Sequence, residues 1–377
     1  MNQTERIRIL HVVFSLDPGG MENGLINVAE RLDPDKYEVH VCCLERVGAF
    51  AERFSHKDRV YKLCKTDGFS WRSLHGLHRL LSKVKPHIVH SHNLGSLIYS
   101  SLATAYGRRC AIFHGEHGQL RGENLEPRRI KQRHKYYRNC ARIHTVSKSL
   151  KNHFLEMGFD AERFDVVVNG VDISYYQPGD KLEARRELGY PEGALLVGIF
   201  SRFGKYKRHA ELLDAFDVLA ARIPDMHLLI VGGGGPIEDA VRERVPKSPY
   251  QERIHLTGFQ QDPRRYYHAV DLVAIPSIVE GLSNAMLEGM ATATPALCNS
   301  VVCGVEDVLN NGENGLMADV CELDDLVRHL EAAVADRDRL ERMGKVARNT
   351  IEDEFSIESM TRKYSEIYSE LAGEVRV

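Results

Sequence analysis

Two glutamates stand eight residues apart in residues 280–291, EGLSNAMLEGMA. Glu280 follows an apolar run, LVAIPS, and Glu288 lies two turns into the helix that the next residues predict. Backbone N–H groups of the small polar turn between them could bind an anion at the helix N-terminus. One exposed capping carboxylate and one solvated helix face would explain the same pattern. The rest of the sequence has to decide between these interpretations.

A second segment, SRFGKYKRHAELL at 201–213, carries two cations between a predicted strand and a predicted helix. Arg202 can bind an anion through two parallel hydrogen bonds, and Lys207 can bind as a compact point charge. Two cations and two helix N-termini at one sheet edge would suit a diphosphate. Solvated surface charge explains this segment equally well when it is taken alone.

Glycines follow the first predicted strand and a later one. Gly19 and Gly20 lie between the first strand and the first helix, where φ > 0 is possible and a ligand can approach the backbone. The strict G-x-G-x-x-G spacing is absent, so a dinucleotide site is not supported. An ordinary strand-to-helix turn is the alternative. The four glycines 232–235 favour a flexible turn more than a site.

Histidines are clustered in the first half, as His90 and His92 and as His114 and His117. Either pair could ligate zinc, but neither has a third ligand at a recognisable spacing, so no metal site is expected. Two D-x-D sequences are typical of helix ends and turns. No nucleophile elbow or P-loop sequence occurs.

Short β-rich runs alternate with helical patterns of 10 to 15 residues along the whole chain. This alternation predicts α/β domains with parallel sheets, which bind ligands at the carboxyl ends of their strands. At 377 residues the chain is longer than one hydrophobic core usually supports. A segment rich in Gly, Pro and Asp, 169–193, is the expected boundary between two domains.

Composition indicates a folded protein, with 43% hydrophobic and 27% charged residues and a net charge of −3. Charge is unevenly distributed: residues 1–180 hold 27 Lys+Arg against 20 Asp+Glu, and residues 181–377 hold 23 against 33. No nucleic-acid-binding module is recognisable, so no nucleic acid partner is expected. Unpatterned cysteines and the lack of a signal peptide or an 18-residue apolar run favour a cytoplasmic location.

The basic excess is greatest at 121–142, where eight Lys+Arg stand against two Glu, interleaved with Tyr136 and Tyr137. After Pro127 the segment could form a basic helix that lies on anionic lipid. A solvated helix that lines an acceptor site is an equal alternative.

Five segments in order, PGGME, VVVNGVD, SRFGKYK, Glu280-x7-Glu288 and NGENGLM, resemble the family-4 glycosyltransferases of the GT-B fold over essentially the whole chain. HGEHG and EGLSNAMLEGMA are most similar to the bacterial exopolysaccharide-type sugar transferases. The resemblance implies two Rossmann-like, doubly wound domains that face each other across a cleft. The implied parts are an acceptor-binding domain at 1–175, a nucleotide-sugar-binding domain at 176–355 and a C-terminal helix at 356–377 that crosses back to the first domain.

The resemblance also implies a function. A hexosyl unit would pass, with retention of configuration, from a UDP- or GDP-linked sugar to a glycan or lipid-linked acceptor in cell-surface polysaccharide or glycoconjugate synthesis. Neither a metal nor another cofactor would be required. The protein would be cytoplasmic, and peripheral at the inner face of the membrane if 121–142 binds anionic lipid. A GT-B-fold nucleotide-sugar epimerase and a non-catalytic nucleotide-sugar binder remain alternatives.

Roles follow from motif position. Glu288 would bind the ribose hydroxyls, and Glu280 would contact the donor sugar near the reacting carbon. His117 best matches the family's N-domain histidine, which contacts the donor sugar; because HGEHG can be aligned in two registers, His114 is the alternative. Arg202 and Lys207 would stabilise the leaving diphosphate. Further donor-binding residues implied by the motifs are Gly19, Gly20, Phe259, Gly281, Leu282, Ser283 and Asn284.

This chain departs from the family pattern in two places. Arg208 stands where the family often has glycine, and would either add a phosphate contact or face solvent. Leu282 and Ser283 stand where proline or phenylalanine is common, so the donor preference of relatives does not transfer.

Overall fold

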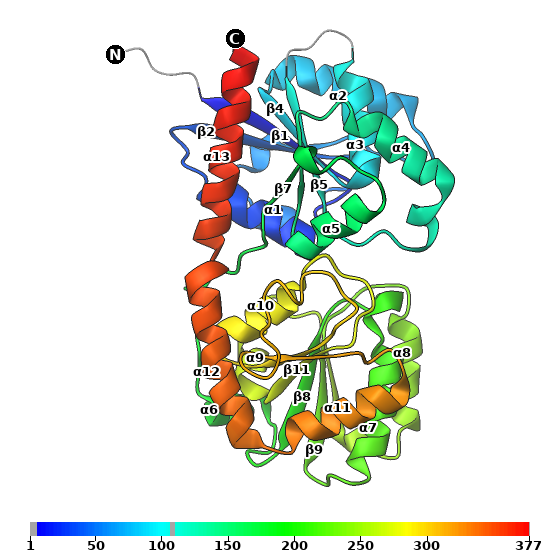
Figure 1. Cartoon of the computed structure of the whole chain (residues 1–377), viewed down its shortest axis with the longest axis vertical. Coiled ribbons are helices and arrows are strands. Elements are labelled where there is room, and N and C mark those ends of the chain that lie inside the picture. Colours follow the sequence, from blue (N-terminus) through cyan, green and yellow to red (C-terminus); the bar gives the residue numbers. More distant parts are fainter. Residues whose placement is uncertain (1–5, 106–109, 377) are drawn as a thin grey trace. The chain divides into compact units, whose positions relative to one another are not determined.

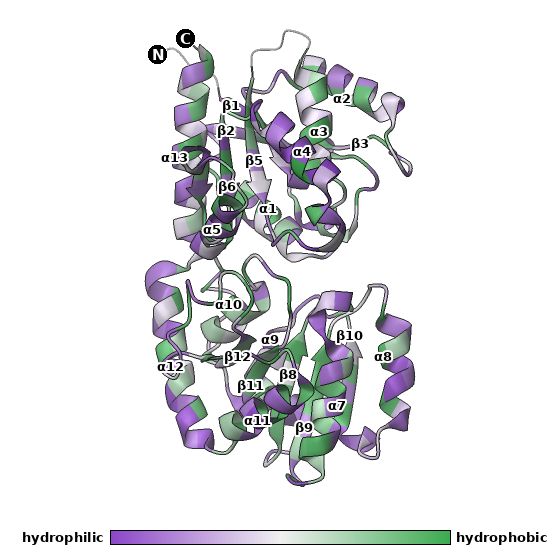
Figure 2. Cartoon of the chain, turned by 45° about the vertical axis from the view of Figure 1, so that its right-hand side comes forward, coloured by the Kyte–Doolittle hydropathy of each residue, from purple (hydrophilic) through white to green (hydrophobic). Residues whose placement is uncertain are grey.

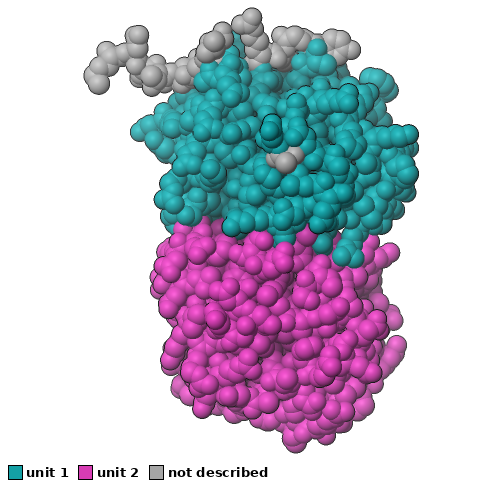
Figure 3. All heavy atoms as spheres, in the orientation of Figure 1, with its two compact units in different colours: residues 1–169, 357–377 teal, residues 170–356 magenta. Residues whose placement is uncertain are grey.

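The computed structural model describes residues 6–105 and 110–376 (Figure 1). Residues 1–169 with 357–377 form one compact unit, unit 1, and residues 170–356 form the other, unit 2 (Figure 3). The domain boundaries predicted from the sequence lie between residues 175 and 176 and between residues 355 and 356. The segment after 169 belongs to unit 2 because the Val171 N–H donates to the Phe355 carbonyl (2.9 Å) and the Arg348 guanidinium donates to the carbonyls of Ile173 and Tyr176.

Unit 1 contains a seven-stranded sheet of order β3-β2-β1-β4-β5-β6-β7, in which every pair is parallel. Its strands are β1 (Ile7–Val13), β2 (Tyr37–Cys43), β3 (Val60–Lys62), β4 (Ile88–His92), β5 (Ala111–Glu116), β6 (Arg142–Thr145) and β7 (Phe164–Val166). Its helices are α1 (Gly20–Arg31), α2 (Trp71–Val84), α3 (Asn93–Thr104), α4 (Pro127–Tyr137), α5 (Lys148–Glu156) and α13 (Ile357–Arg376).

The last helix, α13, completes the core of unit 1, where it packs against α1 and strands β1, β4 and β5 (Figure 1). Tyr364 and Tyr368 are buried against these strands, and the Tyr37 hydroxyl on β2 donates to the Ser365 carbonyl (2.8 Å). A helix separated from the rest of its unit by all of unit 2 therefore closes one face of this sheet.

Unit 2 contains a six-stranded parallel sheet of order β10-β9-β8-β11-β12-β13. Its strands are β8 (Leu195–Phe200), β9 (Met226–Val231), β10 (Ile254–Gly258), β11 (Leu272–Ile275), β12 (Ala296–Asn299) and β13 (Leu316–Ala318). Its helices are α6 (Lys181–Leu188), α7 (His209–Ala220), α8 (Glu238–Arg244), α9 (Arg264–Ala269), α10 (Asn284–Ala291), α11 (Leu323–Val334) and α12 (Arg337–Glu354).

The hydropathy of unit 2 explains why helices cover its sheet. Strands such as β8 are buried along their whole length, and the helices are apolar on one side only (Figure 2). A fully buried parallel strand must be covered on both faces. The predicted α/β class and the Rossmann-like organisation of each domain are therefore confirmed.

Each sheet has one switch point, a pair of neighbouring strands on either side of which the later strands are added in opposite directions. In unit 1 it lies between β1 and β4, and in unit 2 between β8 and β11. Loops diverge at the carboxyl ends of such strand pairs and leave a crevice in which α/β proteins bind ligands. The two switch points are therefore the places to look for functional side chains.

Candidate active site

The switch point of unit 2 brings together the two segments that carry the predicted donor-site charges. Arg202 and Lys207 follow β8, and Glu280 follows β11. The Lys207 ammonium forms an ion pair with the Glu280 carboxylate, in which the two side chains are 29% and 12% exposed. The backbone joins the same segments, since the Ile278 N–H donates to the Tyr206 carbonyl (3.0 Å). Strand order thus makes neighbours of residues 73 positions apart.

The turn formed by residues 281–284 leads from the carboxyl end of β11 into α10, which begins at Asn284. Ser283 caps the helix by accepting a hydrogen bond from the Met286 N–H (3.4 Å). Gly304 presses against the turn so closely that a Cβ there would lie 2.5 Å from the Gly281 carbonyl oxygen. Packing therefore holds these backbone groups in place before any ligand arrives.

A hydrogen bond from a buried tyrosine, Tyr267, holds the Glu288 carboxylate. The Tyr267 hydroxyl donates to Glu288 Oε2 (2.8 Å), and the Tyr267 ring stacks on Phe200, with 3.8 Å between ring centroids. Burial of Tyr267 and the negative charge of Glu288 raise the pKa of this tyrosine well above its usual value, so the hydroxyl remains a donor. Glu288 itself is only half-buried.

Arg202 and Phe259 border the same end of the sheet and are exposed, Phe259 to 51%. The Arg202 side chain has no hydrogen bond or ion pair with any residue that the structure describes. The four glycines 232–235 lie between these segments. A Cβ on Gly232 would lie 1.9 Å from the Ser201 carbonyl oxygen and one on Gly233 would lie 3.0 Å from Phe259, whereas Gly234 has open space around it and a left-handed backbone at φ +73°. Close packing or a positive φ explains these glycines, which the sequence favoured as a flexible turn.

Arg208 takes neither of the two roles predicted for it. Its residue is 6% exposed, and its guanidinium donates to the carbonyls of Val320 and Cys321 and to the Glu211 carboxylate. Its backbone is left-handed, with φ +59°. Glycine adopts this conformation without steric cost. Here an arginine occupies it and gains three hydrogen bonds inside unit 2.

The glycines after β1 also differ from their prediction. Gly19 is extended at φ −169° and caps α1, and Gly20 is the first residue of that helix. Neither has positive φ. Their small size, and not left-handed geometry, is what they offer a ligand near the N-terminus of α1.

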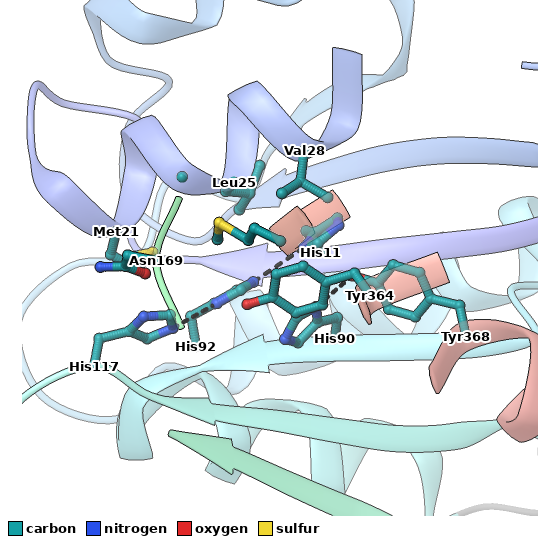
Figure 4. A pocket seen from close by; sticks show the side chains of 12 residues that line it. His11, Met21, Leu25, Val28, His90, His92, His117, Asn169, Tyr364 and Tyr368 are labelled. Carbon is teal, nitrogen blue, oxygen red and sulfur yellow. Dashed lines mark hydrogen bonds between the residues drawn. The ribbon is translucent and has the colours of Figure 1, made fainter. Parts of the chain in front are cut away.

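Histidines on β1 and β4 and directly after β5 form a hydrogen-bonded chain at the switch point of unit 1 (Figure 4). His11 Nδ1 lies 3.0 Å from His92 Nε2, and His92 Nδ1 lies 2.9 Å from His117 Nε2. Burial lowers the pKa of His11 to about 3 and of His117 to about 4, and it holds that of His92 well below its usual value. These imidazoles are therefore neutral at pH 7.

Of the two candidate histidines in HGEHG, His117 belongs to this hydrogen-bonded chain and His114 does not. His117 follows β5 and lines the pocket in Figure 4. His114 is fully buried, bonded to Ser91 Oγ (2.9 Å) and facing Glu116 (3.4 Å). Gly115 between them is required sterically, because a Cβ there would lie 2.7 Å from His117 Nε2. Of the two, His117 is the one placed to meet a ligand.

A third histidine joins His90 and His92, contrary to the expectation that none would. The candidate ligand atoms of His11, His90 and His92 lie within 4.8 Å of one another. Both nitrogens of His90 are already at hydrogen-bond distance, from Tyr368 (2.8 Å) and His144 (3.0 Å). Register explains the grouping, since His11 lies opposite His90 and alternate residues of one strand share a face. Sequence could have shown this only with the strand order known.

The basic segment 121–142 forms η3 (Gly122–Leu125) and α4, which Figure 2 shows as largely hydrophilic. One side of α4 faces inward: Arg133 (3.0 Å) and the Tyr137 hydroxyl (2.7 Å) both donate to buried Glu116. Burial alone would raise the pKa of Glu116, but these bonds and His114 lower it to about 2. Tyr136 is also buried, so the interleaved tyrosines do not face out. Exposed cations remain at Arg121, Arg128, Lys131, Lys135 and Arg138.

None of the helices among the described residues combines the length and apolarity needed to span a bilayer.

Known families match both units. The profile "Glycosyltransferase Family 4" matches residues 18–175, and "Glycosyl transferases group 1" matches residues 180–350. The chain is 36% identical over 195 residues to D-inositol 3-phosphate glycosyltransferase from Nocardia farcinica, covering 50% of this chain and 43% of that one. It is 24% identical to UDP-Gal:alpha-D-GlcNAc-diphosphoundecaprenol alpha-1,3-galactosyltransferase from Escherichia coli, with 97% of each chain covered.

Among solved structures, Anabaena HepE in complex with UDP and glucose superposes with a TM-score of 0.85 at 21% identity, over 97% of this chain and 100% of that one. This likeness concerns the fold. Two family profiles in succession cover every strand of the two sheets except β1, which precedes residue 18, and the predicted motifs SRFGKYK and Glu280-x7-Glu288 follow the two strands of the unit 2 switch point. The chain therefore belongs to the family-4 glycosyltransferases, with the two Rossmann-like domains of the GT-B fold.

Proposed function

We propose that this protein is a retaining, metal-independent glycosyltransferase that moves a hexosyl unit from a UDP-linked sugar to a glycan or lipid-linked acceptor. One observation carries the proposal: the switch point of unit 2 unites Lys207, Glu280 and the capped N-terminus of α10 at one end of the sheet. Glu288 lies on the same helix. Unit 2 thus offers groups for a diphosphate, a sugar and a ribose.

The cations and the helix N-terminus at the switch point of unit 2 would stabilise a diphosphate leaving group. Retaining transfer builds negative charge on the leaving diphosphate, and preorganised donors that meet this charge lower the barrier. Arg202, Lys207 and the first N–H groups of α10 would supply this stabilisation in place of a metal ion. The family resemblance implies a contact with the donor sugar for Glu280 and for His117.

Leu282 and Ser283 leave the donor sugar open, and the choice of UDP and of an acceptor class rests only on what the names of the relatives state. The E. coli relative is named for a UDP-Gal donor and a diphosphoundecaprenol-linked acceptor, and HepE was solved with UDP, with UDP-glucose and with UDP and glucose. We infer a role in cell-surface polysaccharide or glycoconjugate synthesis. The protein would work at the inner face of the membrane, to which the exposed cations of α4 would bring it.

A thermal-shift panel of UDP, GDP and ADP, each with and without EDTA, tests the donor site. A ligand at ~100 times its Kd adds about 2.7 kcal/mol of stability, which is readily measured. UDP alone should raise the Tm, to the same extent with EDTA. Glu288→Ala should abolish most of this shift, because a hydrogen bond to a charged group contributes about 1.5–3 kcal/mol. No shift with any nucleotide would refute the donor-site assignment.

Two further measurements separate the rival functions. A transferase consumes UDP-sugar faster when a lipid-linked or glycan acceptor is added, whereas an epimerase needs no acceptor and a binder turns over nothing. The anomeric proton coupling of the product shows by NMR whether configuration is retained.

A further inference from the structure

We infer that His11 and His92 are positioning residues that fix the tautomer of His117, so that His117 presents its Nδ1–H as a neutral hydrogen-bond donor to the sugar. The sugar contact rests on the proposed function. The hydrogen-bonded chain itself, His11–His92–His117, does not.

Counting protons in the chain leads to two possible arrangements. Three neutral imidazoles carry three ring protons, and two of these fill the hydrogen bonds between His11 and His92 and between His92 and His117. If His11 Nδ1 donates to His92, then His92 donates to His117 Nε2, and the third proton lies on His117 Nδ1. In the reverse arrangement the third proton lies on His11 Nε2, and His117 Nδ1 is a bare acceptor.

The His11 end of the hydrogen-bonded chain distinguishes these two arrangements. His11 is 2% exposed, and its Nε2 is buried without a hydrogen-bond partner among the described residues. The reverse arrangement would leave an unpaired N–H there, and buried orphan donors are rarer than buried orphan acceptors. The first arrangement leaves only the lone pair of His11 Nε2 without a partner there. His117 therefore carries its proton on Nδ1.

Packing prevents the chain from reversing by ring rotation. The His11 and His92 rings are nearly coplanar, with 14° between their planes, and the centroid of the His90 ring lies 4.2 Å from that of His92. His90 is itself held by the Tyr368 hydroxyl of α13. Low pKa values keep every member neutral, so the donor at His117 does not depend on an added proton.

Histidine side-chain ¹⁵N NMR at pH 7.5 tests the inference directly, with His117 assigned from a His117→Gln spectrum. His117 should show a protonated Nδ1 and a bare Nε2 in the wild-type protein. His92→Leu should shift it toward the Nε2–H form, whereas His92→Asn, whose amide can donate from about the position of Nδ1, should restore the wild-type pattern. An Nε2–H tautomer in the wild type, or no change in His92→Leu, would overturn the inference.

Activity gives a second readout. His92→Leu should lower kcat/KM for the nucleotide sugar at least about tenfold, and His92→Asn should recover most of it. The matched control is His227→Leu, which breaks a similar pair in unit 2, His227 to His255 at 3.0 Å. This control should change neither the turnover nor the His117 signal.

The outcomes of the two proposals remain separable. UDP should raise the Tm of the His92 variants as it does that of the wild type, because the diphosphate groups belong to unit 2. A wild type that neither binds nor consumes UDP-sugars refutes the proposed function, while the tautomer measurement still decides this inference. Stoichiometric transition metal in the purified protein would overturn it, since an ion between His11 and His92 would replace their hydrogen bond.

Discussion

The Lys207 ammonium and the Glu280 carboxylate form an ion pair that spans the switch point of unit 2. Both groups were predicted to touch the donor, Lys207 at the diphosphate and Glu280 at the sugar. Their pairing means that a diphosphate must compete with Glu280 for the ammonium. Donor binding would then release the carboxylate at the sugar, so the two contacts would form together.

Substitution of either cation should mainly affect turnover. Arg202→Ala and Lys207→Ala should each lose about 2–4 kcal/mol of transition-state stabilisation, about 30- to 1000-fold in kcat/KM. Lys205→Ala, an exposed neighbour in the same segment, is the control and should stay near wild type. Only Lys207→Ala should also lower the Tm, because it leaves Glu280 unpaired, while Arg202 has no side-chain partner to lose among the described residues. Near-normal turnover in both alanine variants would contradict the role of the cations.

Arg208 allows backbone strain to be weighed against hydrogen bonding. Arg208→Gly should relieve about 1 kcal/mol of left-handed strain but lose three hydrogen bonds of a charged group, each contributing about 1.5 kcal/mol or more, for a net destabilisation of about 3.5 kcal/mol or more. The Tm assigned to unit 2 should fall by at least about 7 °C. Ala293→Gly, at φ +60°, measures the effect of the conformation alone and should not lower the Tm comparably. A rise in Tm for Arg208→Gly would show that strain dominates.

Unit 1 should lose stability in mild acid. His11 faces His90, His92 and Tyr368, and burial lowers its pKa to about 3. An unfolded histidine titrates near 6.5, so below that pH the unfolded state binds a proton that the folded state does not. The free energy of unfolding should therefore fall as the pH drops from about 6.5 toward 4, and His11→Leu should reduce the dependence. Hydrogen exchange of peptides from unit 1 measures this, and equal protection at pH 7.5 and 5 would contradict it.

The exposed cations of α4 should bind anionic vesicles. Each cation near such a surface contributes about 1 kcal/mol, so the charge reversals Lys131→Glu and Lys135→Glu together should weaken binding at least about 30-fold. Arg328→Glu with Arg342→Glu, on exposed positions of unit 2, is the matched control. Affinity for phosphatidylglycerol vesicles should fall as salt is added. Binding that salt does not weaken would exclude the electrostatic contact.

The sequence predicted the fold class because alternation between buried strands such as β8 and amphipathic helices such as α11 is local. Spacing likewise placed Glu280 at the end of a strand and Glu288 within a helix. The pairs Lys207–Glu280 and His11–His92 could not be predicted, because each depends on which strands become neighbours. Arg208 could not be placed either: its inward course follows from a left-handed backbone and from carbonyls that lie 112 and 113 residues away.

The return of α13 to unit 1 sets an order of events during synthesis. Strands β1 to β7 leave the ribosome first, but the helix that carries Tyr364 and Tyr368 emerges only after all of unit 2 has been made. Domains generally fold as they emerge. Until then the nascent first unit has an apolar sheet face and its histidines uncovered, so a chaperone bound at this stage would protect the yield of active protein.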